Sequence, residues 1–209
     1  MKRSIPIEAA PGSGKPRPVV TLRPASTGDK LRVYQWLAQS DATVSMMGPP
    51  LYPELPVTSW KEFCDDYGDF YFDGSKPLEG RCFIIETGGR DIGVICHNRV
   101  FPELGSTDLD IWLRSSDDFG RGYGTVALRT LVDRLSRELS LDRFVIYTSR
   151  RNPRAIAAYL KAGFREITRT EAAEIIEFTE EDLDYRDGVF LGLVQGGGCG
   201  ALPAEREHG

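Results

Sequence analysis

Two aspartates and a tyrosine are the side chains of this sequence that suggest acid–base chemistry. Asp108 and Asp110 alternate with the apolar residues Leu109 and Ile111, so both project to one face of a predicted strand. Tyr159 lies near the end of a predicted helix. A carboxylate can accept a proton and a phenol can donate one, so these residue types suit the roles of general base and general acid. The structural alternatives are solvent exposure or a hydrogen bond to a neighbouring loop for the aspartates, and core packing for the tyrosine.

A glycine-rich loop follows the aspartate strand and reads Phe119-Gly120-Arg121-Gly122-Tyr123-Gly124. Glycines let backbone N–H groups converge, and the N-terminus of the next helix leaves donors unsatisfied at the positive end of its dipole. Such a unit suits an anion, most naturally a phosphate or pyrophosphate. The loop also fits a plain tight turn between strand and helix. It is not a P-loop, because no Lys-Ser/Thr follows the glycines, and its glycine spacing differs from the dinucleotide fingerprint.

Three further elements must position these residues. After the loop, apolar residues line one face of a helix: Leu128, Leu131, Val132, Leu135 and Leu139. The apolar run Phe144–Thr148 is typical of a buried central strand. A second helix then begins with Asn152 as its N-cap and Pro153 as its first residue, and it ends at Gly163.

These segments resemble two motifs of one enzyme superfamily. The glycine loop with its helix resembles motif A of the GNAT superfamily of N-acetyltransferases. The run from Asn152 to Phe164 is similar to motif B, whose usual form N-x-x-A-x-x-x-Y-x-K-x-G-F is present at every fixed position. Motif A often begins with Gln or Arg, whereas this chain has Phe119. An aromatic residue there resembles the branch that contains ribosomal-protein N-terminal acetyltransferases and some aminoglycoside N-acetyltransferases. The resemblance extends less sharply over residues 19–194.

The resemblance implies acetyl-CoA as co-substrate and no metal. Backbone amides from Gly120 to Thr125 would hold the pyrophosphate, with Arg121 adding charge. The strand Leu109–Leu113 would splay from Phe144–Thr148 and leave its backbone beside the pantetheine and the acetyl group. The residues expected to contact the coenzyme are Ile111, Trp112, Leu113, Phe119, Gly120, Arg121, Gly122, Tyr123, Gly124, Thr125, Asn152, Ala155 and Tyr159.

The resemblance also suggests catalytic roles. Tyr159 matches the motif-B tyrosine that donates a proton to the departing thiolate. The place of Asp110, ten residues before Gly120, resembles that of a proposed acidic base in some aminoglycoside acetyltransferases. Asp108 is the second candidate carboxylate. His97 stands near the end of a predicted strand and is more simply explained as a structural residue than as a base.

The acceptor is the least determined part of the function. The sequence favours a small, polycationic, aminoglycoside-like amine. The alternatives are the N-terminus or a lysine of a protein, and a sensor that binds acyl-CoA without turnover. Two predicted helices between residues 26 and 69 are rich in aromatic and acidic side chains, and the segment 171–187 is acidic. Each region is either solvated surface or part of an acceptor wall.

Composition sets the outer limits. The chain has 209 residues, 41% of them hydrophobic, and a formal net charge of −5, with a pI of about 5.2. These values fit one globular domain and give no general electrostatic case for nucleic-acid binding. No apolar stretch approaches a membrane span, no secretory signal is apparent, and the four scattered cysteines have no zinc spacing. We therefore expect a cytoplasmic monomer or homodimer without a membrane partner.

The expected organisation is a flexible leader over 1–17, a single acetyltransferase domain over 18–194, and a disordered tail over 195–209. Predicted strands cover 18–23, 81–86, 91–98, 108–113, 144–148, 165–170 and 188–194. A helix should start at Ser26, with an apolar stripe of Leu31, Tyr34, Leu37 and Ala38. The fold class expected is α/β (α+β), with a GNAT-like mixed, mostly antiparallel sheet of six to seven strands flanked by about four helices.

Overall fold

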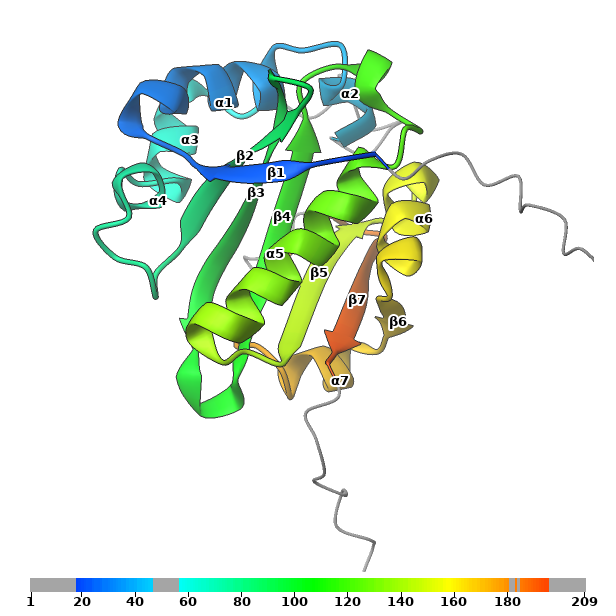
Figure 1. Cartoon of the computed structure of the whole chain (residues 1–209). Coiled ribbons are helices and arrows are strands. Elements are labelled where there is room, and N and C mark those ends of the chain that lie inside the picture. The colour runs from blue at the N-terminus through cyan, green and yellow to red at the C-terminus, as the bar shows by residue number, and fades with distance from the viewer. Residues whose placement is uncertain (1–17, 47–56, 181–182, 184, 196–209) are drawn as a thin grey trace, which may run out of the picture.

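A computed structural model describes residues 18–46, 57–180, 183 and 185–195. It contains one seven-stranded sheet in the order β1-β2-β3-β4-β5-β7-β6 (Figure 1). The strands are β1 (Thr21–Pro24), β2 (Arg81–Thr87), β3 (Arg90–Phe101), β4 (Ser106–Leu113), β5 (Arg143–Ser149), β6 (Arg165–Ile167) and β7 (Gly188–Val194). The expected leader 1–17 and all of the expected tail except Gln195 lie outside the described residues.

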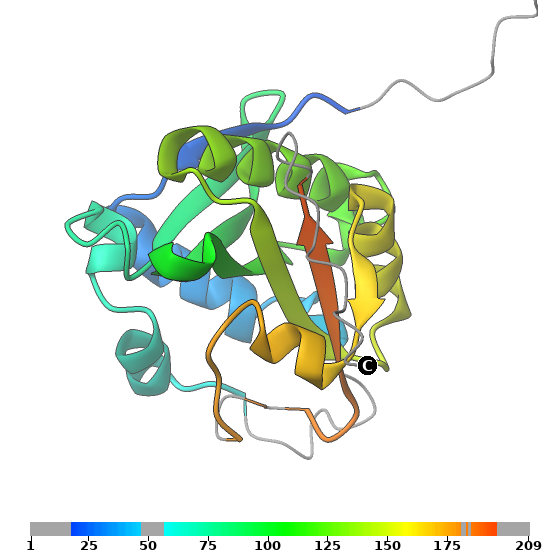
Figure 2. The same cartoon turned by 90° about the horizontal axis from the view of Figure 1, so that it is seen from below.

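The sheet is antiparallel except at its centre, where β4 and β5 run parallel. That parallel ladder is short, since it joins only Ser106–Asp108 to Arg143–Val145. Beyond Asp108 and Val145 the two strands separate, as the resemblance implied. On the far side of β5, the late strand β7 runs between β5 and β6 (Figure 2).

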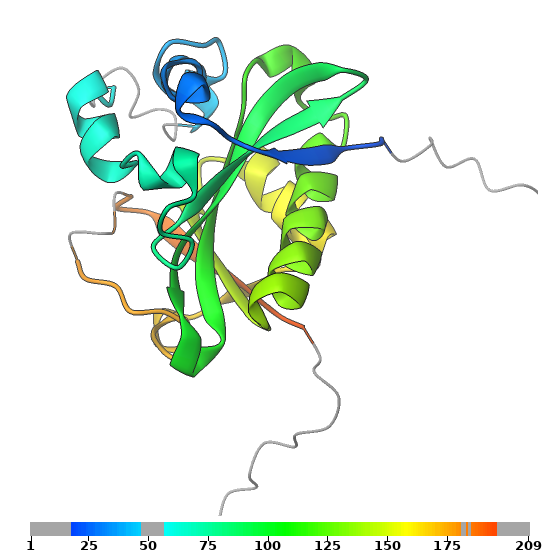
Figure 3. The same cartoon turned by 60° about the vertical axis from the view of Figure 1, so that its left-hand side comes forward.

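Helices cover both faces of the sheet. They are α1 (Lys30–Ala38), α2 (Thr43–Met46), α3 (Trp60–Asp66), α4 (Phe70–Asp73), α5 (Tyr123–Leu139), α6 (Pro153–Ala162) and α7 (Arg169–Ala173). Figure 3 shows α1, α3 and α4 on one face and α5 and α6 on the other. Among the described residues, four helices have seven residues or more and three are single turns, which agrees with the expected fold.

The two faces hold separate parts of the core. Under α5, the predicted stripe is buried at Leu128, Leu131, Val132 and Leu135 and packs on the sheet. On the opposite face an aromatic cluster from α3 and α4 packs around Trp112 of β4. This burial orients β4, because it gives the strand one side toward each core.

The predicted stripe of α1 was partly wrong. Leu31 is 55% exposed, whereas Val33 is fully buried. The helix starts at Lys30, after a 3₁₀ turn over Thr27–Asp29, and the side facing the core runs through Lys30, Val33 and Leu37. Lys30 takes the place of an apolar residue, since its ammonium bonds Asp69 at 2.8 Å and its stem is buried.

The predicted strand 165–170 ends three residues early. Thr168 is the N-cap of α7, and its hydroxyl accepts the Glu171 amide at 3.2 Å. The Glu171 carboxylate accepts the Thr168 amide at 2.7 Å in return. This capping box satisfies the first donors of a helix, so the chain turns into α7 instead of extending β6.

Candidate active site

The glycine loop is held open between β4 and α5. Gly120 has φ +69° and Gly122 has φ +83°, a left-handed backbone that side chains with a Cβ rarely adopt. A Cβ at Gly120 would meet nothing within 4 Å, so it is the backbone conformation, and not crowding, that requires glycine there. The first intrahelical bond runs from the Val126 amide to the Gly122 carbonyl at 3.1 Å. The amides of Tyr123, Gly124 and Thr125 therefore precede the ladder of α5.

Two polar contacts fix this loop to its neighbours. The buried Asp118 carboxylate receives the Arg114 guanidinium at 3.1 Å, which ties the start of the loop to the end of β4. The Thr125 hydroxyl donates to the Ala158 carbonyl at 3.2 Å, which ties the first turn of α5 to α6. The helix N-terminus and the motif-B helix are thus held side by side.

A cavity of about 270 Å³ opens between the loop, the end of β4 and α6. All the residues predicted to contact the coenzyme line it, except Arg121. Sequence reasoning missed Ser45, Asp118, Leu128, Arg154, Ala157, Ala158 and Lys161, which also line it. Lys161 is a fixed position of motif B and could have been included, whereas Ser45 comes from a distant segment without a recognisable pattern.

The positive charge at this cavity comes from α6 and not from the loop. Arg154 and Lys161 line the cavity. The Arg154 guanidinium lies 4.3 Å from the ring centre of Phe119. Phe119, at the position where the motif often has Gln or Arg, therefore carries an arginine on its face.

The separation of β4 from β5 leaves one edge of β4 without a neighbouring strand among the described residues. Leu113, Trp112 and Ile111 pair with Gly93, Val94 and Ile95 of β3. Their other edge faces the gap, because the ladder to β5 ends at Asp108. Backbone N–H and C=O groups on that edge are available to an extended ligand that enters the cavity.

Tyr159 projects from α6 toward this gap and is 7% exposed. Burial raises the pKa of Tyr159 above its usual value, and the nearby charge of Asp110 raises it further, while a hydrogen bond with Thr148 acts the other way. The phenol is therefore protonated at neutral pH. Tyr159 on α6 and Asp110 on β4 are therefore near enough for the carboxylate charge to affect the phenol.

Asp108 and Asp110 lie on the Trp112 face of β4, as predicted, and they share a hydrogen-bond cluster. The Tyr67 hydroxyl donates to Asp110 Oδ2 at 3.0 Å. Asn98 Nδ2 donates to Asp108 Oδ2 at 2.6 Å and to Asp110 Oδ2 at 3.0 Å. The Tyr71 hydroxyl donates to Asn98 Oδ1 at 3.0 Å. The contributions of Asn98, Tyr67 and Tyr71 were not predicted from the sequence.

The charges of this cluster affect its tyrosines. Desolvation raises the pKa of Tyr67 well above its usual value, and the Asp110 carboxylate adds to the effect. Desolvation likewise raises the pKa of Tyr71, with further contributions from Cys96 and both aspartates. Both hydroxyls keep their protons at neutral pH and act as donors.

His97 does not join this cluster. It is 2% exposed, its ring lies 6.5 Å from that of Phe83, and its Nδ1 lies 3.0 Å from the Asn98 carbonyl oxygen. Burial lowers the pKa of His97, so the ring is neutral at neutral pH. This geometry fits the structural reading of the sequence.

Most acids of the segment 171–187 that the structure describes form ion pairs. Glu171 pairs with Arg165 at 3.0 Å, and Asp187 pairs with Arg151 at 2.8 Å. Glu180 pairs with Arg169. Residues 181, 182 and 184 of this segment lie outside the description.

The described residues contain neither a metal site nor a membrane-spanning helix. Over 18–46, 57–180, 183 and 185–195, no cluster of His, Cys, Asp and Glu side chains could hold a metal ion. Within the same ranges, no helix has the length and apolar character needed to span a membrane.

Comparison with known proteins agrees with this architecture. The Acetyltransf_3 family model, described as an acetyltransferase (GNAT) domain, matches residues 20–165. Spermidine N-acetyltransferase from Vibrio cholerae, solved with CoA and spermine, aligns over 84% of this chain and 95% of its own, with 19% identity and a TM-score of 0.62. The aminoglycoside acetyltransferase AAC(6')-Ib, solved with coenzyme A, aligns over 84% and 95%, with 21% identity and a TM-score of 0.60. RimL, a ribosomal L7/L12 alpha-N-protein acetyltransferase solved with CoA, aligns over 84% and 94%, with 19% identity and a TM-score of 0.60.

Proposed function

The chain belongs to the GNAT acetyltransferase family, and from this premise we propose that it transfers acetyl from acetyl-CoA directly to the primary amine of a small cationic acceptor. One observation carries the proposal. Tyr159, a protonated phenol, lines the cavity with the glycine loop, and the Asp110 carboxylate, whose neighbours Ile111 and Trp112 line the same cavity, is near enough for its charge to raise the pKa of Tyr159. An acyl transfer to an amine needs these two groups at one place.

The cavity residues fit coenzyme A. Gly120 and Gly122 turn the loop so that its amides and the N-terminus of α5 suit a pyrophosphate. Arg154 and Lys161 add positive charge beside them. The open edge of β4 suits the amides of pantetheine. When bound, acetyl-CoA supplies an acetyl thioester as the acyl donor.

The acceptor must lose a proton before it can attack. A lysine-like amine has a pKa of about 10, so it is almost entirely an ammonium ion at neutral pH. Asp110 takes that proton directly or through a water molecule, and Asp108 contributes a second negative charge. The amine nitrogen then bonds to the carbonyl carbon, the carbon–sulfur bond breaks, and Tyr159 donates its proton to the sulfur. The second proton that the nitrogen loses on forming the amide restores the Tyr159 phenol, and Asp110 returns its proton to solvent.

A cationic small molecule is supported by the charges near Asp110 and by structural similarity. Two carboxylates lie at this side of the gap, and the formal net charge of the chain is −5. Proteins of the same fold include a spermidine and an aminoglycoside acetyltransferase. The second candidate, the N-terminal amine or a lysine of a protein, is favoured by the similarity to RimL.

The test is coenzyme A release from acetyl-CoA with a panel of aminoglycosides, polyamines, amino acids and short peptides. Turnover with polyamines or aminoglycosides, reduced in Tyr159→Phe and Asp110→Asn, supports the proposal. Turnover with peptides alone supports the second candidate. If no amine reacts while acetyl-CoA still raises the melting temperature, the donor site is real, the proposed acceptors are wrong, and either another acceptor or the sensor alternative applies.

A further inference from the structure

A β-bulge in β3 lies beside the two aspartates. His97 pairs with Leu109 and Val100 pairs with Thr107, so Asn98 and Arg99 together oppose the single residue Asp108. The Thr107 hydroxyl contacts the carbonyl oxygens of Asn98 at 3.1 Å and Arg99 at 3.0 Å, which holds the bulge in shape. Bulges of this kind redirect side chains and often lie next to active sites.

The side chain of Asn98 is half-buried between the two carboxylates. Its Nδ2 carries two hydrogens and donates to Asp108 Oδ2 at 2.6 Å and to Asp110 Oδ2 at 3.0 Å. Its Oδ1 accepts the Tyr71 hydroxyl at 3.0 Å, so every polar atom of the amide has a partner. One neutral group thus links two like charges that would otherwise repel each other.

The cluster uses the two oxygens of Asp110 unequally. Oδ2 accepts from both Asn98 and Tyr67, at 3.0 Å each. Within the described part of the chain, both of these hydrogen bonds end on Oδ2, and Asp110 Oδ1 accepts neither of them. Since a carboxylate oxygen with two donors is fixed in place, Oδ1 has a defined direction and keeps its full capacity to accept a proton.

We infer that Asn98 is a positioning residue for the transfer reaction: its amide holds Asp108 and Asp110 together and orients Asp110 so that Oδ1 receives the proton of the acceptor. This inference rests on the proposed function, in which Asp110 is the base. The titratable groups around Asp110 are Tyr67 at the C-cap of α3, Tyr71 from α4, Cys96 of β3, Asp108 of β4 and Tyr159 from α6.

Two substitutions separate this role from simple packing. Asn98→Ala removes both donors, and Asn98→Asp keeps the shape but replaces the donors with a third carboxyl group. We expect kcat to fall about tenfold or more in Asn98→Ala and further in Asn98→Asp, since a hydrogen bond to a charged group is lost. Losing donors disfavours an ionised carboxylate, so the pH below which kcat/KM declines should rise in both variants.

The effect of Asn98 on the two carboxylates can also be measured without an acceptor amine, by NMR. In the full-length protein labelled with ¹³C-aspartate, the carboxyl carbon signals of Asp108 and Asp110 can be followed as a function of pH. Their titrations should move to higher pH in Asn98→Ala relative to the unsubstituted protein. Thr107→Val is the graded variant, because it loosens the bulge that carries Asn98 but leaves the Asn98 amide in place. It should move both titrations and the pH dependence of kcat/KM in the same direction as Asn98→Ala, but by less.

The outcomes are distinct. If Asp110→Asn retains full activity, the proposed base is wrong, and the titrations still test whether Asn98 holds the carboxylates. If Asp110→Asn is impaired while both Asn98 variants keep their rates, pH profiles and titrations, the inference alone is overturned. A milder effect of the isosteric Asn98→Asp than of Asn98→Ala would also overturn it, because packing would then be the role. Coenzyme A binding within about twofold of the unsubstituted protein shows that each variant is folded; should Asn98→Asp unfold, Asn98→Ala decides.

Discussion

The guanidinium of Arg154 lies over the ring of Phe119, 4.3 Å from its centre, and both side chains line the cavity beside the glycine loop. Phe119 is the first residue of the loop and Arg154 belongs to the first turn of α6, so the contact joins the two sequence motifs. It places an exposed cation where the phosphates of coenzyme A are expected. Although Phe119 is itself uncharged, its ring therefore holds the positive charge of Arg154 at the site.

Replacing either partner should weaken coenzyme binding. Phe119→Leu removes the aromatic face, and cation–π contacts of this kind are worth about 0.5–1 kcal/mol, so the Kd for coenzyme A should rise about two- to fivefold. Arg154→Met should cost more and reduce the dependence of Kd on salt, because it removes the charge itself. Calorimetry at low and high salt measures both effects. Arg137→Met, at the far end of α5, is the control and should leave Kd unchanged.

Tyr159→Phe should lower kcat about 10²-fold with little change in the KM for acetyl-CoA, since a general acid is lost and the ring remains. The pKa of Tyr159 is raised by burial and by Asp110, so the phenol stays protonated at all pH values below about 10. Up to about pH 9, the pH dependence of kcat in the unsubstituted enzyme should consequently be the same as in Tyr159→Phe. A basic decline found only in the unsubstituted enzyme would contradict this role.

The local part of the site was predictable because each piece of it is contiguous in sequence. The glycine loop, the N-cap Asn152 and the stop at Gly163 are set by short-range backbone preferences, and the structure has all three. The contacts of Asp110 with Asn98 and Tyr67 span 12 and 43 residues. Those contacts depend on how a bulge in β3 and the end of α3 pack against β4. No periodicity in the sequence predicts that packing.

Burial of polar residues limited the rest of the prediction. Lys30 and Asp29 are both buried, although hydrophobic patterning assigns such residues to the surface. Each is buried because it has an ionic partner from another segment: Lys30 bonds Asp69, and Asp29 bonds Arg23. Without those partners in view, the inner face of α1 was assigned to Leu31 instead of Val33.

Asp110→Asn should reduce kcat at least tenfold while coenzyme A affinity stays within about twofold, since a positioned general base is typically worth about 10²–10⁴ in rate. Coupled detection of free thiol measures the rate, and calorimetry measures the affinity. Asp108→Asn should have a smaller effect, because Asp108 is two residues further from Trp112 than Asp110 is and belongs to the parallel ladder, where β4 and β5 have not yet separated. Equal or larger impairment of Asp108→Asn would reverse the two assignments.

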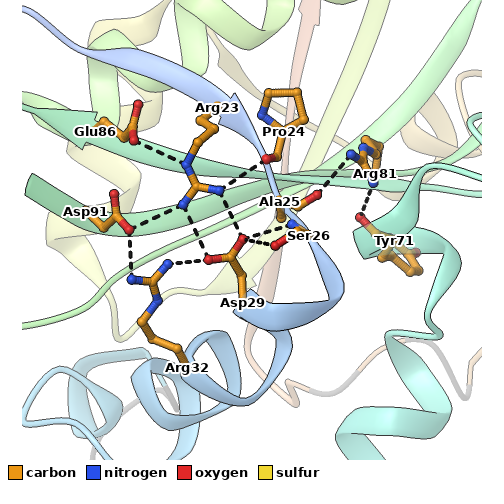
Figure 4. Close-up of polar contacts among 10 residues, drawn as sticks. All are labelled: Arg23, Pro24, Ala25, Ser26, Asp29, Arg32, Tyr71, Arg81, Glu86 and Asp91. Atoms are coloured by element: carbon orange, nitrogen blue, oxygen red, sulfur yellow. Dashed lines mark hydrogen bonds and ion pairs between the residues drawn. The ribbon is translucent and has the colours of Figure 1, made fainter. Parts of the chain in front are cut away.

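A charge network at the start of the domain should govern its stability at low pH. In Figure 4, Arg23 and Arg32 converge on Asp29, and Asp91 bridges the two arginines. Asp29 also accepts the Ser26 amide and hydroxyl at 2.9 Å each. Burial alone would raise the pKa of Asp29, but hydrogen bonds from Arg23 and Ser26 outweigh it and hold that pKa well below its usual value.

A carboxylate whose pKa is lowered by folding stabilises the native state above its unfolded pKa and loses that contribution as the pH falls. The unsubstituted protein should therefore be most stabilised by Asp29 above about pH 4, and progressively less so below it. Asp29→Asn should lower the free energy of unfolding by about 2 kcal/mol at pH 7, and the difference should shrink toward pH 2. Urea unfolding across this range measures both. Glu86→Gln is the control at the half-buried edge of the network, where Glu86 accepts Arg23 at 3.2 Å and the Thr21 hydroxyl at 3.4 Å, and it should lower the free energy of unfolding by less than about 1 kcal/mol. An Asp29→Asn deficit that is independent of pH would mean that the carboxylate contributes through its shape and not through its charge.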